Sequence, residues 1–189
     1  MRIISGKFKR KKLLTPRGMT IRPTADKQRE SLFNILAETV IGATVLDLYA
    51  GTGAMGIEAL SRGAQSVVFI DNDLQSMRLI KENIRSFQIE SSSQVIHWNI
   101  LKNLSCLKDH VFDLILMDPP YHHAHVQTTL SHLLNIHCLN EQTLIVAEHA
   151  VSDNILIPKE FIQYDSRRYG KTQLSFFASF SSVRAISAL

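Results

Sequence analysis

Short apolar runs alternate with segments in which apolar residues recur every three or four positions, over most of the chain after residue 24. The runs predict strands, and the spaced positions predict amphipathic helices. The predicted strands are Thr44–Ala50, Ser66–Asp71, Gln94–Trp98, Val111–Asp118 and Thr143–Glu148. Strands that are apolar along their whole length and alternate with helices are typical of a parallel sheet covered on both faces. We therefore expect an α/β fold with a mostly parallel sheet.

Four amphipathic helices are predicted around these strands. The first runs from about Ala25 to Val40, and Thr24 or Asp26 could cap its start. The second follows a glycine-rich turn and ends near Gly63. The apolar faces of the other two consist of Leu74, Met77, Ile80, Ile84 and Phe87, and of Val126, Leu130, Leu133 and Leu134.

The two ends of the chain depart from this pattern. Residues 1–15 predict a short basic hairpin, in which Gly6 is able to take the turn. Beyond Pro158, two strand-like runs, Phe161–Asp165 and Gln173–Phe177, predict a C-terminal antiparallel hairpin. The pattern thus divides the chain into a basic N-terminal extension packed on the core (residues 1–40), the core itself (41–177) and a tail (178–189) that we expect to be disordered.

Composition excludes several classes of protein. The 189 residues are 45% hydrophobic and 20% charged, which is ordinary for a globular protein and unlike a disordered or fibrous one. The longest run without Asp, Glu, Lys or Arg, Pro119–Asn140, holds five histidines and a proline pair, so we expect no membrane span. The two cysteines, Cys106 and Cys138, cannot build a disulfide framework, and we expect them to be buried small hydrophobes in a cytoplasmic protein.

Positive charge is concentrated at the N-terminal end. Residues 1–30 hold ten Lys or Arg against two acids, a net charge of +8, whereas the whole chain carries +4. The remaining residues therefore carry a net −4. A basic arm on a mildly acidic body is typical of a protein that binds a polyanion such as nucleic acid. A solvated basic tail with no partner is the alternative.

A glycine motif follows the first predicted strand. Gly51, Gly53 and Gly56 fit the G-x-G-x-x-G pattern between a strand and a helix, where glycines permit a tight turn and close approach of a ligand. Asp71 comes twenty residues after Gly51, at the end of the second strand, where an acid can bind both hydroxyls of a ribose. The combination predicts a cofactor that contains a nucleoside.

The acid before this turn favours one kind of cofactor. Asp47 lies four residues before Gly51 and would repel the pyrophosphate of a dinucleotide while attracting an amino group. S-adenosylmethionine carries an ammonium and a sulfonium and no phosphate, so we expect it rather than NAD. Asn99, after the third strand, could bind the adenine region.

A second motif indicates the reaction class. Asp118-Pro119-Pro120-Tyr121 (DPPY) follows the fourth strand, at the edge of the sheet where open α/β folds bind ligands. The Asp118 side chain and a rigid carbonyl of Pro119 could accept both hydrogens of a planar exocyclic amine, and Tyr121 could stack on the attached base. Catalysis would then consist mostly of positioning. The pattern leaves open whether Asp118 also takes the proton.

Together these motifs resemble a known family. DPPY with the glycine turn resembles amino-methyltransferases of the Rossmann-like, class I, S-adenosylmethionine-dependent type. The resemblance narrows to the RsmD family over about residues 1–177, through MRIISG (1–6), RPT (22–24), RESLFN (29–34), DLYAGTGAMG (47–56), EALSRGA (58–64), DPPY (118–121) and YGKT (169–172). It implies an enzyme that methylates the exocyclic N2 of a guanine in 16S ribosomal RNA, within the 30S particle.

The resemblance also implies roles for individual residues. Donor binding falls to Asp47, Gly51, Gly53, Asp71 and Asn99, with the neighbouring Ala50, Thr52, Asn72 and Ile100. Recognition of the amine falls to Asp118, Pro119, Pro120 and Tyr121. The basic extension would hold the RNA through Arg2, Lys9, Arg10, Lys11 and Arg22.

Other readings of the same residues stay open. The target could be adenine N6 or another amine, although a protein-glutamine enzyme would more naturally carry Asn before the two prolines. The chain could be a ribosome-assembly factor with a silent site, or an NAD-dependent oxidoreductase, which Asp47 and DPPY disfavour. His122, His123 and His125 follow DPPY, and we expect a lid over the substrate there rather than a metal site. We expect a monomer.

Overall fold

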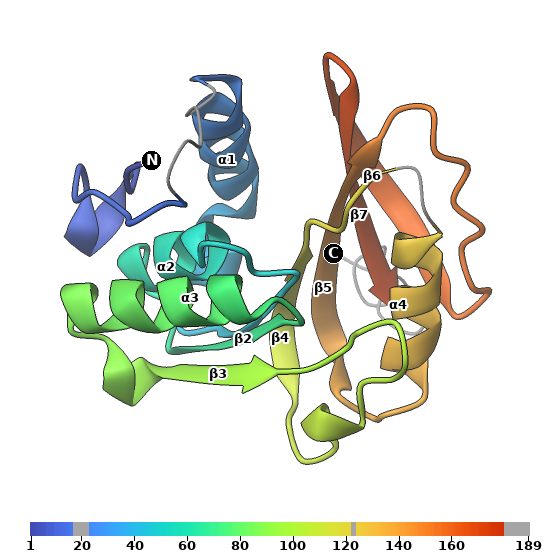
Figure 1. The fold of residues 1–189 in the computed structure, drawn as a ribbon. Coiled ribbons are helices and arrows are strands. Elements are labelled where there is room, and N and C mark those ends of the chain that lie inside the picture. The colour runs from blue at the N-terminus through green and yellow to red at the C-terminus, as the bar shows by residue number, and fades with distance from the viewer. Residues whose placement is uncertain (17–22, 122–123, 180–189) are drawn as a thin grey trace.

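The computed structural model describes residues 1–16, 23–121 and 124–179, with the side chains of 23–25 excepted. These residues form a seven-stranded sheet in the order β3-β2-β1-β4-β5-β7-β6 (Figure 1). The strands are β1 (Thr44–Leu48), β2 (Ser66–Asp71), β3 (Ser93–His97), β4 (Phe112–Met117), β5 (Leu139–Ala150), β6 (Phe161–Tyr169) and β7 (Thr172–Ser179). The helices are α1 (Pro23–Leu36), α2 (Ala54–Ser61), α3 (Leu74–Phe87) and α4 (His125–Leu134), with short 3-10 turns η1 (Gly6–Phe8), η2 (Ala37–Val40), η3 (Glu90–Ser92) and η4 (Ser105–Leu107).

The sheet has the predicted mixed character. Strands β1 to β5 pair in parallel, whereas β7 is antiparallel to both β5 and β6. The chain therefore has the predicted α/β fold with a C-terminal hairpin. Because all five parallel strands end at the same edge of the sheet, the segments that follow β1, β4 and β5 are brought together there.

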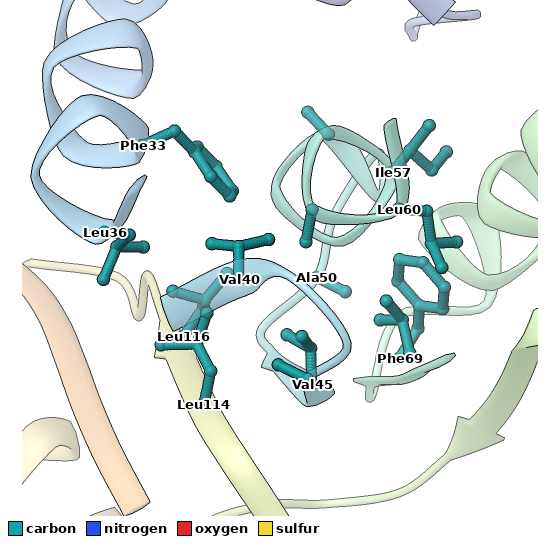
Figure 2. Packing of buried hydrophobic residues seen from close by; sticks show 14 of the residues in the cluster. Phe33, Leu36, Val40, Val45, Ala50, Ile57, Leu60, Phe69, Leu114 and Leu116 are labelled. Carbon is teal, nitrogen blue, oxygen red and sulfur yellow. The ribbon is translucent and has the colours of Figure 1, made fainter. Parts of the chain in front are cut away.

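Apolar residues cover both faces of the sheet, since alternate side chains of a strand point to opposite faces. Residues of α1, α2 and α3 pack with Val45, Phe69, Leu114 and other residues on one face. Figure 2 shows this packing around Val45. Residues of α4 pack on the other face, against Leu46, Ile115 and their neighbours.

Several boundaries differ from the sequence prediction. Helix α1 begins at Pro23, whose fixed φ suits a first helical turn, so Thr24 and Asp26 lie inside the helix and not at the position before it. Strand β5 extends to both sides of the predicted apolar run. Strand β7 continues to Ser179, so Ala178 and Ser179 pair within the sheet and do not belong to a disordered tail. The rest of the predicted tail, residues 180–189, lies outside the described residues.

The N-terminal arm, residues 1–16, is less regular than the hairpin predicted for it. It has one isolated antiparallel bridge, between Arg2 and Lys12, and it turns through η1. Gly6 takes the turn at φ +79°, and a Cβ atom there would lie 1.8 Å from the Ser61 carbonyl oxygen of α2. Only glycine fits both the backbone conformation and the space.

Side chains of α2 and α3 hold the arm by its backbone. Glu58, which is fully buried, accepts the N–H groups of Ile4 at 2.8 Å and Ser5 at 3.0 Å. Asn83, also fully buried, accepts the N–H of Leu14 at 2.8 Å and donates to its carbonyl at 3.1 Å. The arm therefore satisfies its backbone groups in two ways: by hydrogen bonds between its own two sides, such as Ile3 N–H to the Lys11 carbonyl at 3.0 Å, and by side chains of the core.

Within the parts of the chain that the structure describes, no helix is both long enough and apolar enough to cross a membrane.

Candidate active site

A pocket of about 300 Å³ opens at the carboxyl ends of the parallel strands. Its walls come from α1, the turn after β1, α3 and the ends of β4 and β5. Asp47, Gly51 and Thr52 line it from the glycine turn, and Asp118 and Glu148 line it from the neighbouring strands. Residues from both sequence motifs therefore meet in one cavity.

Strand register explains why three carboxylates face this pocket. Leu48 pairs with Met117 and Met117 with Ala147, so the ends of β1, β4 and β5 lie level. Asp47, Asp118 and Glu148 each lie two residues beyond a core residue of the α1–α3 face, namely Val45, Leu116 and Val146. Because side chains alternate along a strand, all three acids point to that same face.

The two acids of the glycine motif hold the turn together. Gly51 and Gly53 adopt φ of +54° and +75°, a region that glycine enters at little cost. The Asp71 carboxylate accepts the N–H of Gly51 at 2.8 Å, and Asp47 accepts the N–H of Gly56 at 2.8 Å. A Cβ atom on Gly56 would lie 2.3 Å from Phe69 Cε1, so glycine is also needed where α2 approaches β2.

Asp47 makes the pocket a poor site for a pyrophosphate. Its buried carboxylate already binds an N–H of the first turn of α2, the place where a dinucleotide phosphate would bind. Burial raises the pKa of Asp47 to about 8, and the hydrogen bond from Gly56 opposes that rise. A cationic ligand would stabilise the charged form of Asp47. The acidic lining of the pocket therefore fits a compound with a sulfonium and an ammonium group better than it fits a phosphate.

A hydrogen-bonded network joins DPPY to the neighbouring strands. The Tyr121 hydroxyl donates to Glu148 Oε1 at 2.6 Å and lies 2.9 Å from Thr172 Oγ1 of β7. The pKa of Asp118 is raised, because protein atoms displace water around it and because Glu148 and Asp47 add negative charge nearby. Burial likewise raises the pKa of Glu148. The site thus concentrates hydrogen-bond acceptors beside an aromatic ring.

Tyr49 is a pocket residue that the sequence reasoning did not select. It follows β1 with φ +60°, an uncommon value for a residue with a side chain. Its hydroxyl lies 2.8 Å from Thr129 Oγ1 in α4, and its ring stacks on that of His125. Burial raises its pKa to about 12. Tyr49 therefore connects the lining of the pocket to α4.

The predicted site residues do not all reach the pocket. Asp47, Ala50, Gly51, Thr52 and Asp118 line it. Gly53, Asp71, Asn72, Asn99, Ile100, Pro119, Pro120 and Tyr121 do not, although Asp71 binds Gly51 and Tyr121 binds Glu148.

Asn72, Asn99 and Ile100 are engaged elsewhere. The Asn72 carbonyl oxygen lies 3.0 Å from His97 Nε2, and the Asn99 side chain accepts the N–H of Leu101 at 3.0 Å. Ile100 is buried in the core on the α4 side of the sheet. Their predicted role in donor binding stays a prediction.

The residues predicted to hold RNA lie mostly on the surface of the arm. Arg2, Lys9 and Arg10 are exposed, and Arg22 lies outside the described residues. Lys11 folds back on the end of α3, where its ammonium donates to the Ser86 carbonyl. The same ammonium lies 4.3 Å from the centre of the Phe87 ring. Lys11 therefore anchors the arm in addition to any role in binding. The predicted lid residues His122 and His123 also lie outside the described residues.

Two further pocket residues, Glu148 and Arg29, were not among the predicted site residues. Glu148 ends the apolar run of the fifth strand, so its place at the carboxyl edge was visible in the sequence. Arg29 is buried, donates to the Arg2 carbonyl at 2.7 Å and pairs with Asp26 at 3.1 Å. Nothing short of the fold indicates that an arginine of α1 would turn toward the pocket.

Solved structures of other proteins share this architecture. The yhhF protein of Escherichia coli is 27% identical, with a TM-score of 0.83 and coverage of 95% of this chain and 97% of that one. A ribosomal protein L11 methylase from Lactobacillus delbrueckii subsp. bulgaricus is 20% identical, with a TM-score of 0.67 and coverage of 93% and 89%. The fold is therefore the Rossmann-like fold of class I S-adenosylmethionine-dependent methyltransferases.

Sequence comparison defines the family more narrowly. The family described as Conserved hypothetical protein 95 matches residues 1–178. Ribosomal RNA small subunit methyltransferase D of Escherichia coli (strain K12) is 32% identical over 155 residues, which cover 82% of this chain and 77% of that protein. The chain belongs to this family, the RsmD family of rRNA methyltransferases.

Proposed function

We propose that this protein transfers a methyl group from S-adenosylmethionine to the exocyclic N2 amine of a guanosine in 16S ribosomal RNA, within an assembled or assembling 30S particle. One observation carries the proposal: the glycine turn and Asp118 of DPPY line the same pocket of about 300 Å³. The name of the Escherichia coli relative supports small-subunit rRNA as the substrate.

The side of the pocket formed by the glycine turn binds the methyl donor, S-adenosylmethionine. S-adenosylmethionine carries its methyl group on a positively charged sulfur, which makes the methyl carbon an acceptor of electrons. Asp47 is a buried carboxyl group whose charged form a cationic ligand stabilises, and Gly51 and Thr52 line the pocket after it. Asp71 braces the turn through Gly51, so its carboxylate is held where the turn and the end of β2 meet. These residues bind and orient the donor.

The acceptor side positions the amine. Asp118 and the carbonyl of Pro119 accept the hydrogens of the amine, so that its nitrogen lone pair faces the methyl carbon. The nitrogen–carbon bond forms as the sulfur–carbon bond breaks, and sulfur keeps the electron pair. The nitrogen then carries a positive charge and releases one proton. The raised pKa of Asp118 suits it to receive that proton.

Exposed basic residues of the arm and of the β6–β7 hairpin supply affinity for RNA. Figure 1 shows the arm, α1 and the tip of the β6–β7 hairpin along the upper side of the molecule. Lys9 and Arg10 are exposed on the arm, and Arg168 and Lys171 are exposed at the hairpin tip. Contacts of this kind bind phosphates irrespective of sequence, so they hold the RNA while the pocket selects the amine.

The test is methyl transfer from labelled S-adenosylmethionine to 30S particles assembled from unmodified 16S RNA, with the product nucleoside identified by mass spectrometry. The expected product is N2-methylguanosine. Asp118→Ala should abolish transfer while donor affinity, measured by calorimetry, changes little, because Asp118 contacts the amine and not the donor. Asp153→Ala, at a residue outside this pocket, serves as the matched control.

Other outcomes would change the conclusion. N6-methyladenosine would keep the donor and the fold and replace the target. Tight donor binding without labelled RNA would contradict RNA as the acceptor. Absence of donor binding would favour an assembly factor that acts by binding alone. If Asp118→Ala loses affinity for S-adenosylmethionine as strongly as it loses methyl transfer, the division of the pocket into a donor side and an acceptor side is wrong.

A further inference from the structure

Glu148 is a pocket carboxylate for which the proposed reaction has no step. It lies in β5, beside Asp118, and both residues line the same cavity. The pairing of Met117 with Ala147 makes Asp118 and Glu148 neighbours on adjacent parallel strands, about 4.8 Å apart along the hydrogen-bonding direction. Both side chains point to the α1–α3 face. The pocket therefore presents two carboxylates side by side.

The network around Tyr121 fixes Glu148 as an acceptor. The Tyr121 hydroxyl donates its single hydrogen to Glu148 Oε1, so the Thr172 hydroxyl must donate to the Tyr121 oxygen. Thr172 belongs to the YGKT segment and thus orients the tyrosine from β7. With Oε1 engaged by the phenol, Oε2 is the oxygen with which Glu148 can accept a hydrogen from a bound base.

Guanine presents two hydrogen-bond donors side by side, as Asp118 and Glu148 present two carboxylates. Its exocyclic N2 amine and its N1–H are adjacent donors on one edge, whereas adenine has a lone pair at N1 beside its amine. Enzymes that act on an extruded base read this edge by hydrogen bonds and hold the ring by stacking. A base stacked on Tyr121 with its amine at Asp118 would bring its N1 toward the carboxylate of the adjacent strand.

We propose that Glu148 is the specificity-determining residue of the site, accepting the N1–H of the target guanine beside Asp118. The inference rests on the proposed function, since it names the base that the same pocket selects. A carboxylate oxygen facing N1 accepts a hydrogen from an N–H group and repels a lone pair, so guanine is accepted and bases with an unprotonated N1 are rejected. A site built to bind an N–H group discriminates strongly against an analogue that lacks it.

The experiment uses 2-aminopurine, which has the same exocyclic amine but a lone pair at N1. The methylated guanosine is first mapped in 30S particles, and 2-aminopurine is then placed at that position by splinted ligation of the 16S RNA. The full chain is compared with Glu148→Gln, whose amide can accept from N1–H or donate to a lone pair. Thr172→Val is the matched control, because it loosens Tyr121 and keeps the carboxylate. The readout is the ratio of kcat/KM for guanine to that for 2-aminopurine.

The wild-type ratio should be about tenfold or more, as for a well-made base contact. Glu148→Gln should bring it close to one, and Thr172→Val should lower both rates and keep the ratio. Each ratio is measured within one variant, so a partly misfolded fraction cancels. An unchanged ratio in Glu148→Gln, or an equal fall in both variants, overturns the inference and leaves the proposed function standing. Absence of N2-methylguanosine with the wild-type protein overturns both.

Discussion

Replacing Asn83 with alanine tests how the N-terminal arm is held against the pocket. Asn83 lies in α3 and is fully buried. Its side chain binds both backbone groups of Leu14 and also donates to the carbonyl of Thr52 in the glycine turn at 3.0 Å. One amide therefore links the arm, a core helix and a segment that lines the pocket. Alanine removes all three hydrogen bonds and leaves their partners behind.

The size of the effect follows from these bonds. A hydrogen bond contributes about 1 kcal/mol net, so the three bonds together contribute about 3 kcal/mol. Water can reach the groups of Leu14 once the arm loosens, because this residue lies at the surface. We therefore expect a loss of about 2–3 kcal/mol in the free energy of unfolding. For a chain of this length that lowers the Tm by about 4–12 °C.

Two measurements check the value. Thermal unfolding gives the loss of stability, and limited digestion with trypsin reports opening of the arm, whose lysines offer cleavage sites. Asn135→Ala is the matched control, since Asn135 is exposed and its side chain donates one hydrogen bond, to the Ser131 carbonyl. It should stay within about 0.5 kcal/mol of wild type. If Asn83→Ala unfolds and is cleaved like Asn135→Ala, the amide does not hold the arm.

The remaining predictions concern charge. Burial raises the pKa of Asp47 from 3.8 to about 8, so the folded state keeps a proton that the unfolded state releases across this range, and stability falls as pH rises through it. Asp47→Asn should therefore show a smaller fall in Tm between pH 5 and pH 8, and an equal fall in both proteins would contradict the assignment. Lys9→Gln with Lys12→Gln should make RNA binding less sensitive to salt, lowering the slope of log K against log salt by up to about 1.4. A slope identical to wild type would mean that neither lysine lies on a phosphate.

Strands with one continuous apolar run and helices with one apolar face were predictable from the sequence. The bounds of β2 and α3 match the predicted ones, because Ser66–Asp71 is apolar between polar ends and the spaced residues from Leu74 to Phe87 form a single face. The glycine turn was equally visible, since its three glycines follow a buried strand. In these cases local pattern and tertiary packing favour the same structure.

Features held by residues far apart in the chain were not predictable. The irregular arm depends on Glu58 and Asn83, which are more than fifty residues away from the groups they bind. The same holds in the pocket. Asp118 was predicted from DPPY, whereas the partnership of Tyr121, Glu148 and Thr172 arises from the pairing of β5 with β7. The local pattern predicts that β6 and β7 form a hairpin, but it does not indicate that β7 also pairs with β5.

The anchoring of the arm has a consequence for the order of events during protein synthesis. Leu14 leaves the peptidyl transferase centre 69 residues before Asn83, the side chain that binds it. At about 5–20 residues per second, this interval lasts roughly 3–14 s. Throughout it Leu14 lacks the side chain that binds its backbone, although the lysines and arginines of the arm are already made. The arm therefore cannot complete its anchoring until α3 has been made.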